Sequence, residues 1–152
     1  MSIVISREKL LKALGLDLDS IIEALLRTIA PVREKTEKIL DSYTIYPKST
    51  VEHVIKCEEP YSAVVLTIRA EYHTLATSNL RAVWLYSQDG ENYDTIEDSI
   101  EEMHFVDVSF SPGETRQRTT LIPLLTNHIK LVFINTDVNV PVVVTAWASF
   151  MR

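Results

Sequence analysis

Glycine and cysteine are scarce in this chain of 152 residues, and each shortage excludes a class of site. The three glycines, at positions 15, 90 and 113, are too few and too scattered to build a phosphate-binding loop. The single cysteine, Cys57, excludes an internal disulfide framework and the usual cysteine-based zinc site. No Gly-x-Ser-x-Gly or His-Glu-x-x-His motif occurs, and the four histidines stand singly. We therefore expect no catalytic residue, no metal site, no cofactor and no enzyme activity.

Basic stripes are also missing. The formal net charge is -6, and residues 89–107 contain eight carboxylates but no Lys or Arg. A nucleic-acid-binding protein needs cations that displace the counterions of the phosphate backbone, so we expect no nucleic-acid partner. The acidic stretch has two interpretations. Carboxylates can hold calcium, but the spacing does not match an EF-hand loop, and we favour a solvated loop that blocks strand pairing.

Long apolar runs do not occur. No segment reaches the roughly 18–20 apolar residues that span a bilayer, so we expect no membrane partner. The N-terminal Ile3-Val4-Ile5 is too short for the core of a signal peptide, and charged residues follow it directly. These features predict a location in the cytoplasm or in a particle assembled inside a cell.

The first 42 residues have helical periodicity and are predicted to form an N-terminal helical segment. Pro31 interrupts the pattern and should kink or break the helix. Apolar residues near heptad spacing predict a seam that includes Ile22, Leu26, Ile29 and Ile39. Two interpretations stay open: the helix packs on its own domain, or it associates with copies of itself as a dimer or trimer.

Residues 43–152 have the period-two alternation of β-strands. The clearest runs are 64–71, 81–86, 104–110, 129–134 and 142–151, with shorter strands near 50–56 and 116–122. Turn-forming residues separate them, and no helix is predicted between them. The fold class is therefore mainly β: an antiparallel, jelly-roll-like β-sandwich preceded by α-helices.

Several strands are apolar on both faces, although a free sandwich normally shows water one polar face. The outward positions include Val65, Val132, Val143 and Trp147. The N-terminal helix can cover one such face and neighbouring subunits another. Trp147 is thus a candidate for a subunit contact.

The run Val83-Trp84-Leu85-Tyr86-Ser87-Gln88-Asp89-Gly90-Glu91-Asn92-Tyr93 resembles the strand–turn–aromatic segment of discoidin-like (galactose-binding-like) sandwiches. It is also similar to small β-sandwich proteins of phage and archaeal virus particles. The resemblance covers about residues 80–150 and implies a sandwich fold. The terminal cysteine pair common in discoidin domains is absent.

Two functions follow as expectations. The first is a non-enzymatic structural or attachment protein that forms a homo-oligomer, for instance a virion or tail component. The alternative is a carbohydrate-binding module that uses loops at the rim of the sandwich, because aromatic faces can stack on sugar rings. The candidate ligand-binding residues are Trp84, Tyr86, Asp89, Asn92 and Tyr93, although Trp84 is also expected in the core.

Overall fold

The computed structural model describes residue 15, residues 19–22 and residues 33–152. The chain divides into two compact units, residues 1–32 and residues 33–152. In the first unit, residues 19–22 are helical and the side chain of Ile22 is 46% exposed. The second unit contains all the strands found in the described residues.

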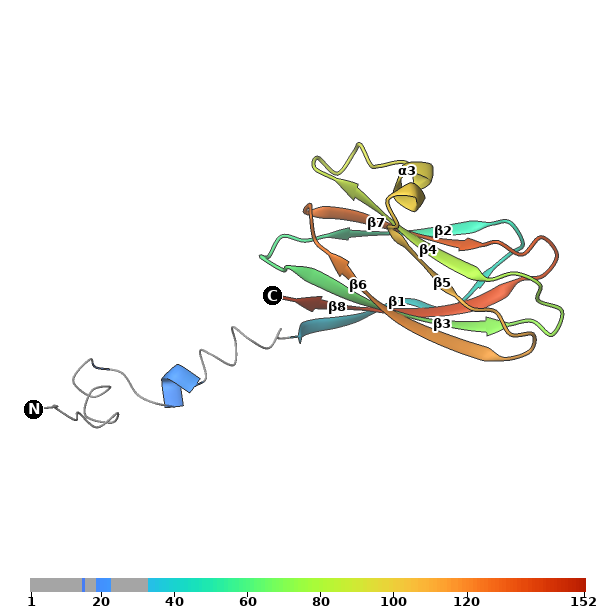
Figure 1. Ribbon diagram of the computed structural model, residues 1–152, viewed down its shortest axis with the longest axis horizontal. Coiled ribbons are helices and arrows are strands. Elements are labelled where there is room, and N and C mark those ends of the chain that lie inside the picture. The colour runs from blue at the N-terminus through green and yellow to red at the C-terminus, as the bar shows by residue number, and fades with distance from the viewer. Residues whose placement is uncertain (1–14, 16–18, 23–32) are drawn as a thin grey trace, which may run out of the picture. The chain divides into compact units, whose positions relative to one another are not determined.

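The second unit is a sandwich of two four-stranded antiparallel sheets, which Figure 1 shows one above the other. One sheet, called sheet A here, has the order β1-β8-β3-β6, and the other, sheet B, has the order β2-β7-β4-β5. This order, with strands from opposite ends of the chain side by side, is that of a jelly roll. The strands are β1 (Arg33–Ile45), β2 (Thr50–Lys56), β3 (Ala63–Tyr72), β4 (Leu80–Ser87), β5 (Phe105–Val108), β6 (Thr115–Pro123), β7 (His128–Asn135) and β8 (Val142–Met151).

The core lies between the two sheets and is built from alternate residues of the strands. In β3, Val64, Leu66 and Ile68 are fully buried, whereas the residues between them are at least partly exposed. Leu131 and Phe133 of β7 are likewise fully buried and come from the facing sheet. The predicted mainly-β sandwich is therefore confirmed, and the strands expected from periodicity lie within a few residues of their predicted positions.

The prediction of helix up to residue 42 is wrong for residues 33–42, because they form most of strand β1. β1 pairs with β8 but has three irregularities of register, and these interrupt its alternation and hide the strand in the sequence. Ile39 is part-buried and packs against the core from β1, so it does not belong to a helical seam. Leu26 and Ile29, two other apolar residues of the predicted seam, lie outside the described residues.

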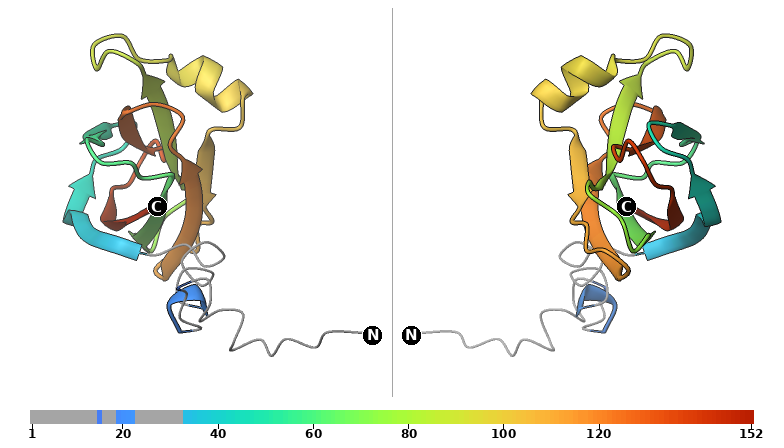
Figure 2. Two further views of the ribbon diagram at one scale, coloured as in Figure 1. Left: turned by 90° about the vertical axis from the view of Figure 1, so that its left-hand side faces the viewer. Right: turned by 90° about the vertical axis from the view of Figure 1, so that its right-hand side faces the viewer.

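A short helix that the sequence did not predict, α3 (Ile96–Glu101), lies between β4 and β5. Thr95 caps it by accepting a hydrogen bond from the backbone N–H of Asp98 at 3.1 Å. Ile96 and Ile100, four residues apart, share one side of the helix and pack against the outer face of sheet B. Figure 2 shows α3 standing over that sheet, so the second apolar face of sheet B is covered from within the chain.

Four loops meet at one end of the sandwich: 46–49, 73–79, 109–114 and 136–141. Figure 1 shows them at the end opposite the start of β1. Asp137, which is 2% exposed, joins three of them. Its carboxylate accepts hydrogen bonds from the backbone N–H groups of Thr77, Ser78, Asn139 and Val140, and its carbonyl oxygen accepts one from Lys48. The fourth loop is joined by a hydrogen bond from Gly113 to His73. This end is therefore held rigidly by main-chain contacts.

Candidate binding surfaces

The predicted ligand-binding turn, residues 87–92, is a closed local structure. Asp89 accepts hydrogen bonds from the Ser87 hydroxyl and from the backbone N–H groups of Glu91 and Asn92, and a further one from the Asn92 side chain. The N–H groups of Asn92 and Glu91 hold the pKa of Asp89 well below its usual range. Gly90 has a φ of +79°, and a Cβ there would lie 2.8 Å from the His128 ring. Asp89 is therefore engaged in shaping the turn.

The aromatic residues predicted for ligand binding do not share one exposed surface. Trp84 and Tyr86 are each 6% exposed and belong to the core, and the Tyr86 hydroxyl donates to the carbonyl oxygen of Pro123 at 2.5 Å. Tyr93 instead packs against the outer face of sheet B, where the Lys130 ammonium lies 4.3 Å from its ring centroid. A shallow hollow of about 320 Å³ at the turn includes Tyr86, Asp89 and Asn92 but not the other two aromatics. Stacking of a sugar on the buried Trp84 ring is excluded by this geometry.

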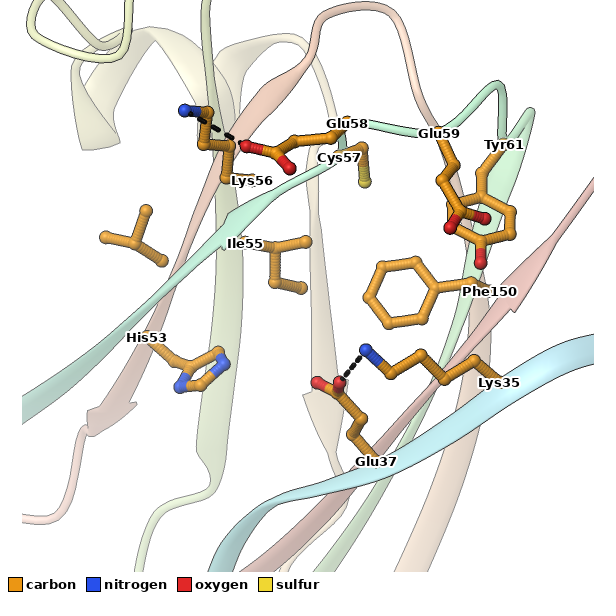
Figure 3. Close-up of a pocket in the computed structure, with 11 residues that line it drawn as sticks. Lys35, Glu37, His53, Ile55, Lys56, Cys57, Glu58, Glu59, Tyr61 and Phe150 are labelled. Atoms are coloured by element: carbon orange, nitrogen blue, oxygen red, sulfur yellow. Dashed lines mark ion pairs between the residues drawn. The ribbon is translucent and has the colours of Figure 1, made fainter.

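A groove of about 320 Å³ lies between β1 and β2, the edge strands of the two sheets (Figure 3). Ile55 from β2, Cys57 just after β2 and Phe150 from β8 supply buried apolar surface. Tyr61 lies beside Phe150, with the ring centroids 5.2 Å apart. The sequence did not predict this groove, because Phe150 of the last strand joins the lining from β1 and β2 only in the folded chain.

Charged side chains of both signs stand along the groove. Lys35 and Glu37 form an ion pair at 2.6 Å, and Lys56 and Glu58 form another at 3.4 Å. The hydrogen bond to Glu37, with its negative charge, raises the pKa of Lys35 above its ordinary value. Burial raises the pKa of the Cys57 thiol, which keeps it protonated and unreactive at neutral pH. The groove is thus a binding surface of mixed polarity and has no activated nucleophile.

Exposed apolar residues stand on all four loops at the end opposite the start of β1. Tyr46 and Leu75 are 67% and 68% exposed, and Val138 and Phe110 are 54% and 44% exposed. Large apolar side chains scattered singly need no explanation, but four on neighbouring loops of one end form a candidate contact surface. We call these four residues the loop-end cluster. The sequence singled out these loops only as turns.

Trp147, predicted as a subunit contact, lies on the outer face of sheet A and is partly exposed. Its neighbour across β3 is Thr67, and its neighbour across β1 is Lys38, whose ammonium lies 6.0 Å from the ring centroid. The sequence correctly assigned Trp147 to the side opposite Val144 and Ala146, both of which are fully buried.

The acidic residues of the 89–102 stretch are exposed, in agreement with the interpretation that they are solvated. They do not form one loop throughout, because Glu97, Asp98 and Glu101 belong to α3. Within residues 15, 19–22 and 33–152, no three His, Cys, Asp or Glu side chains are grouped to hold a metal ion. Over the same residues, no helix is long and apolar enough to cross a membrane.

Comparison with known proteins gives little further information. No protein-family model matches the chain, and no curated protein matches it. One solved structure, described as a novel family GH115 4-O-methyl-alpha-glucuronidase, BtGH115A, with specificity for decorated arabinogalactans, is similar at 12% identity with a TM-score of 0.42. The match covers 76% of this chain and only 16% of that enzyme. The likeness is too slight to bear on function. Of the expected resemblance to discoidin-like and virus-particle proteins, only the β-sandwich is supported, and the comparisons show no match to either group.

Proposed function

We propose that this protein is a non-enzymatic attachment protein that works as a homo-oligomer, with a virion or tail-associated particle as its setting. Copies associate, and each copy presents the loop-end cluster to a target. The proposal assigns recognition and assembly to different parts of the chain. No catalytic step is involved.

One observation carries the proposal. The chain enters β1 at one end of the sandwich, and the exposed apolar residues Tyr46, Leu75, Phe110 and Val138 lie on the loops of the opposite end. Strand β1, with which the folded unit begins, thus starts away from the loop-end cluster. Tyrosine is among the residue types enriched where binding energy concentrates at protein interfaces, so Tyr46 is the strongest candidate of the four.

The test begins with the mass of the full chain in solution, beside a chain that starts at Arg33, where the folded unit begins. Light scattering should give a discrete oligomer for the full chain and a smaller species for the shortened one. If the full chain and the shortened chain are both monomers, the result counts against assembly and leaves the loop-end cluster without its oligomeric setting.

Recognition is tested with Tyr46→Ser and Leu75→Ser in the full chain, with the target particle or cell envelope as the binding partner. Both residues are more than 60% exposed, so each variant should fold normally. Each should also bind the target more weakly than the unaltered chain. Gln88→Ser, which changes an exposed residue at the other end, serves as the control.

Carbohydrate binding is the second candidate, and the groove between β1 and β2 favours it over the turn at residues 87–92. The groove combines the part-exposed ring of Tyr61, which lies beside the buried Phe150, with charged hydrogen-bonding groups, and binding sites for small molecules use such a mixture. A glycan array with the full chain and with Tyr61→Ala tests this. A glycan that binds both proteins equally would not use the groove. If no glycan on the array binds the full chain, carbohydrate binding is rejected.

A further inference from the structure

We infer that β2, the outer strand of sheet B, pairs antiparallel with β2 of a second copy of this chain, about a two-fold axis that passes beside Val54. Sheet B then continues from one copy into the other. This inference rests on the proposed homo-oligomer and specifies one of its contacts. Three features of β2 support it: the free edge, the direction of the backbone groups and the order of the charges.

Four strands stand at the edges of the two sheets, β1 and β6 in sheet A and β2 and β5 in sheet B. Bulges, short length and charged side chains blunt such an edge against pairing. β1 has three irregularities of register, and β5 has only four residues. β6 is long and regular, but its only charged residues are Arg116 and Arg118, so a second copy of β6 offers them no carboxylate. β2 is regular over seven residues and has charges of both signs, which can match each other.

The backbone groups of β2 point alternately toward β7 and toward the free edge. Cys57, just after the strand, donates its N–H to the carbonyl oxygen of Asn127 at 2.8 Å. Ser49, just before the strand, accepts from the N–H of Asn135 at 3.1 Å. Odd-numbered residues of β2 thus face β7, because the N–H and C=O of one residue point to the same side of an antiparallel strand. The N–H and C=O groups of the even-numbered residues face the free edge, where no strand among the described residues pairs with them.

The even-numbered residues at the centre of β2 are Glu52, Val54 and Lys56, and all three are exposed. An axis at Val54 sets Glu52 of each copy directly opposite Lys56 of the other, and sets Val54 opposite itself. The same pairs exchange backbone hydrogen bonds, because their N–H and C=O groups face the edge. Opposite charges directly across two strands stabilise the pairing, and in a two-fold contact the pair occurs twice. The strand is therefore complementary to itself in both backbone and charge.

Other registers of the same antiparallel pairing do not match the charges. Moving the axis by two residues sets Glu52 opposite Glu52 or Lys56 opposite Lys56, and like charges directly opposite are destabilising. Moving the axis by one residue either brings Glu52 opposite Glu58 of the other copy or leaves both charges opposite uncharged residues. The order of charges along the strand therefore selects the axis at Val54.

The second copy extends ion pairs that the folded unit already contains. A carboxylate oxygen of Glu52 lies 3.8 Å from the Lys130 ammonium, and the Lys56 ammonium lies 3.4 Å from a carboxylate oxygen of Glu58. In the dimer, Glu52 stands between Lys130 of its own copy and Lys56 of the other, so the charges alternate in sign across the junction. The odd-numbered residues of β2 bear no carboxylate or ammonium group, so no like charges oppose each other on the inner side.

The contact is narrow, and this sets the strength of the association. One pair of edge strands buries less surface than the roughly 1,600 Å² of a standard interface, so the dimer should form reversibly as the concentration rises. Pairing also joins two four-stranded sheets at their free edges, so β2 is no longer an exposed template for further strands.

Charge reversal in the full chain tests the pairing. Glu52→Lys places ammonium groups opposite each other at both symmetric positions, and Lys56→Glu does the same with carboxylates. Sedimentation equilibrium should show the dissociation constant of the dimer raised at least about tenfold by either change. The matched control is Glu101→Lys, which changes the net charge equally to Glu52→Lys but lies on α3, and it should leave association unchanged. Thermal melts at low concentration, where the copies are separate, confirm that each variant is folded.

A mixture of the two single variants gives the sharpest result. A Glu52→Lys copy and a Lys56→Glu copy carry only opposite charges across the axis. An equimolar mixture should therefore associate about as tightly as the unaltered chain, although neither variant does so alone. The double variant Glu52→Lys with Lys56→Glu interchanges the charges and should recover in the same way. Association through another surface would give no such recovery.

A disulfide locates the axis directly. Hydrogen-bonded residues opposite each other in antiparallel strands have Cα atoms about 5.5 Å apart, within the range that a disulfide spans. Val54→Cys in the full chain, with copper phenanthroline as the oxidant, should therefore give a covalent dimer. Leu121→Cys on β6 is the control, because Leu121 is 57% exposed and Val54 is 52% exposed, and it should give none. The native Cys57 is buried and is present in both variants.

The outcomes separate this inference from the proposed function. If the unaltered chain associates but the charge reversals leave its association unchanged and Val54→Cys gives no covalent dimer, β2 is not an interface, and the homo-oligomer assembles through other residues. If the unaltered chain is a monomer at every concentration, both the β2 contact and the proposed homo-oligomer are wrong.

Discussion

The two lateral edges of the sandwich are built differently. On the β5–β6 side, three hydrogen bonds cross between the sheets: Tyr72 to the carbonyl oxygen of Val108, Tyr86 to that of Pro123, and Arg118 to that of Asp107. On the β1–β2 side, the sheets separate around a groove lined by apolar and charged side chains. The first edge is closed by hydrogen bonds between the sheets, and the second is held by its strands and remains accessible. Stability should therefore depend on the closed edge, and variation should be tolerated at the open one.

Alkaline pH should give the largest effect, because it acts on two tyrosines of the closed edge together. Burial raises the pKa of Tyr72 and of Tyr86 to about 12, from an ordinary value of 10. The stabilisation is complete below pH 10 and is lost as the pH rises through 12, since the unfolded chain then ionises more readily. Two pKa units correspond to roughly 3 kcal/mol for each tyrosine. Urea unfolding between pH 8 and pH 12 measures this, and a flat profile would contradict it.

Tyr72→Phe tests the closed edge at a single site. The hydroxyl donates to Val108 and accepts from the backbone N–H of Leu80 at 3.0 Å, so its removal leaves two buried groups unpaired. The expected loss is about 2–4 kcal/mol of unfolding free energy. Tyr46→Phe is the matched control, because Tyr46 is 67% exposed and its change should have no effect. Equal stabilities of the two variants would show that the closed edge does not depend on this contact.

Arg118→Ala should have a smaller effect at the same edge. Its guanidinium donates to the carbonyl oxygen of Asp107 at 3.0 Å, but the contact is exposed, and its loss should cost about 1 kcal/mol or less. Arg116→Ala, two residues away, breaks only an exposed ion pair with Glu114. The melting temperature should fall more for Arg118→Ala than for Arg116→Ala. A larger loss for Arg116→Ala would refute the assignment of Arg118 as the cross-sheet link.

Lys35→Gln and Lys56→Gln should have the smallest effect, because both lysines belong to exposed ion pairs at the open edge. Such pairs are screened by solvent and add little to stability. Melting temperatures should not change measurably for either variant. A clear decrease would mean that the groove is itself a structural contact and would weaken its candidacy as a binding site.

Sequence reasoning recovered most of the sandwich because the strands bury alternate residues. β3 and β8 carry this pattern over ten residues each, and their predicted and observed ranges nearly coincide. It failed for β1, where bulges break the alternation and Lys and Glu residues favour a helix. It also missed α3, whose two isoleucines stand among acidic residues that suggested a loop.

The candidate sites were less predictable because they depend on tertiary neighbours. Tyr86 and Trp84 have the alternation of strand residues, and only the facing sheet decides that both rings are buried. The groove needs Phe150 from the last strand beside Tyr61 from an early loop, and no local pattern brings them together. The outer position of Trp147 was predicted correctly, because alternate residues of a strand point to opposite faces of the sheet.

The way Asp137 fastens the loops has an evolutionary consequence. The Asp137 carboxylate accepts hydrogen bonds from main-chain N–H groups, which every non-proline residue supplies. These contacts therefore do not depend on which side chains the loops carry. The exposed residues Tyr46, Leu75, Phe110 and Val138 can then be exchanged for others without disturbing the backbone that carries them. A lineage carrying this fold is free to change its binding preference by substitution at the loop tips while inheriting the scaffold intact.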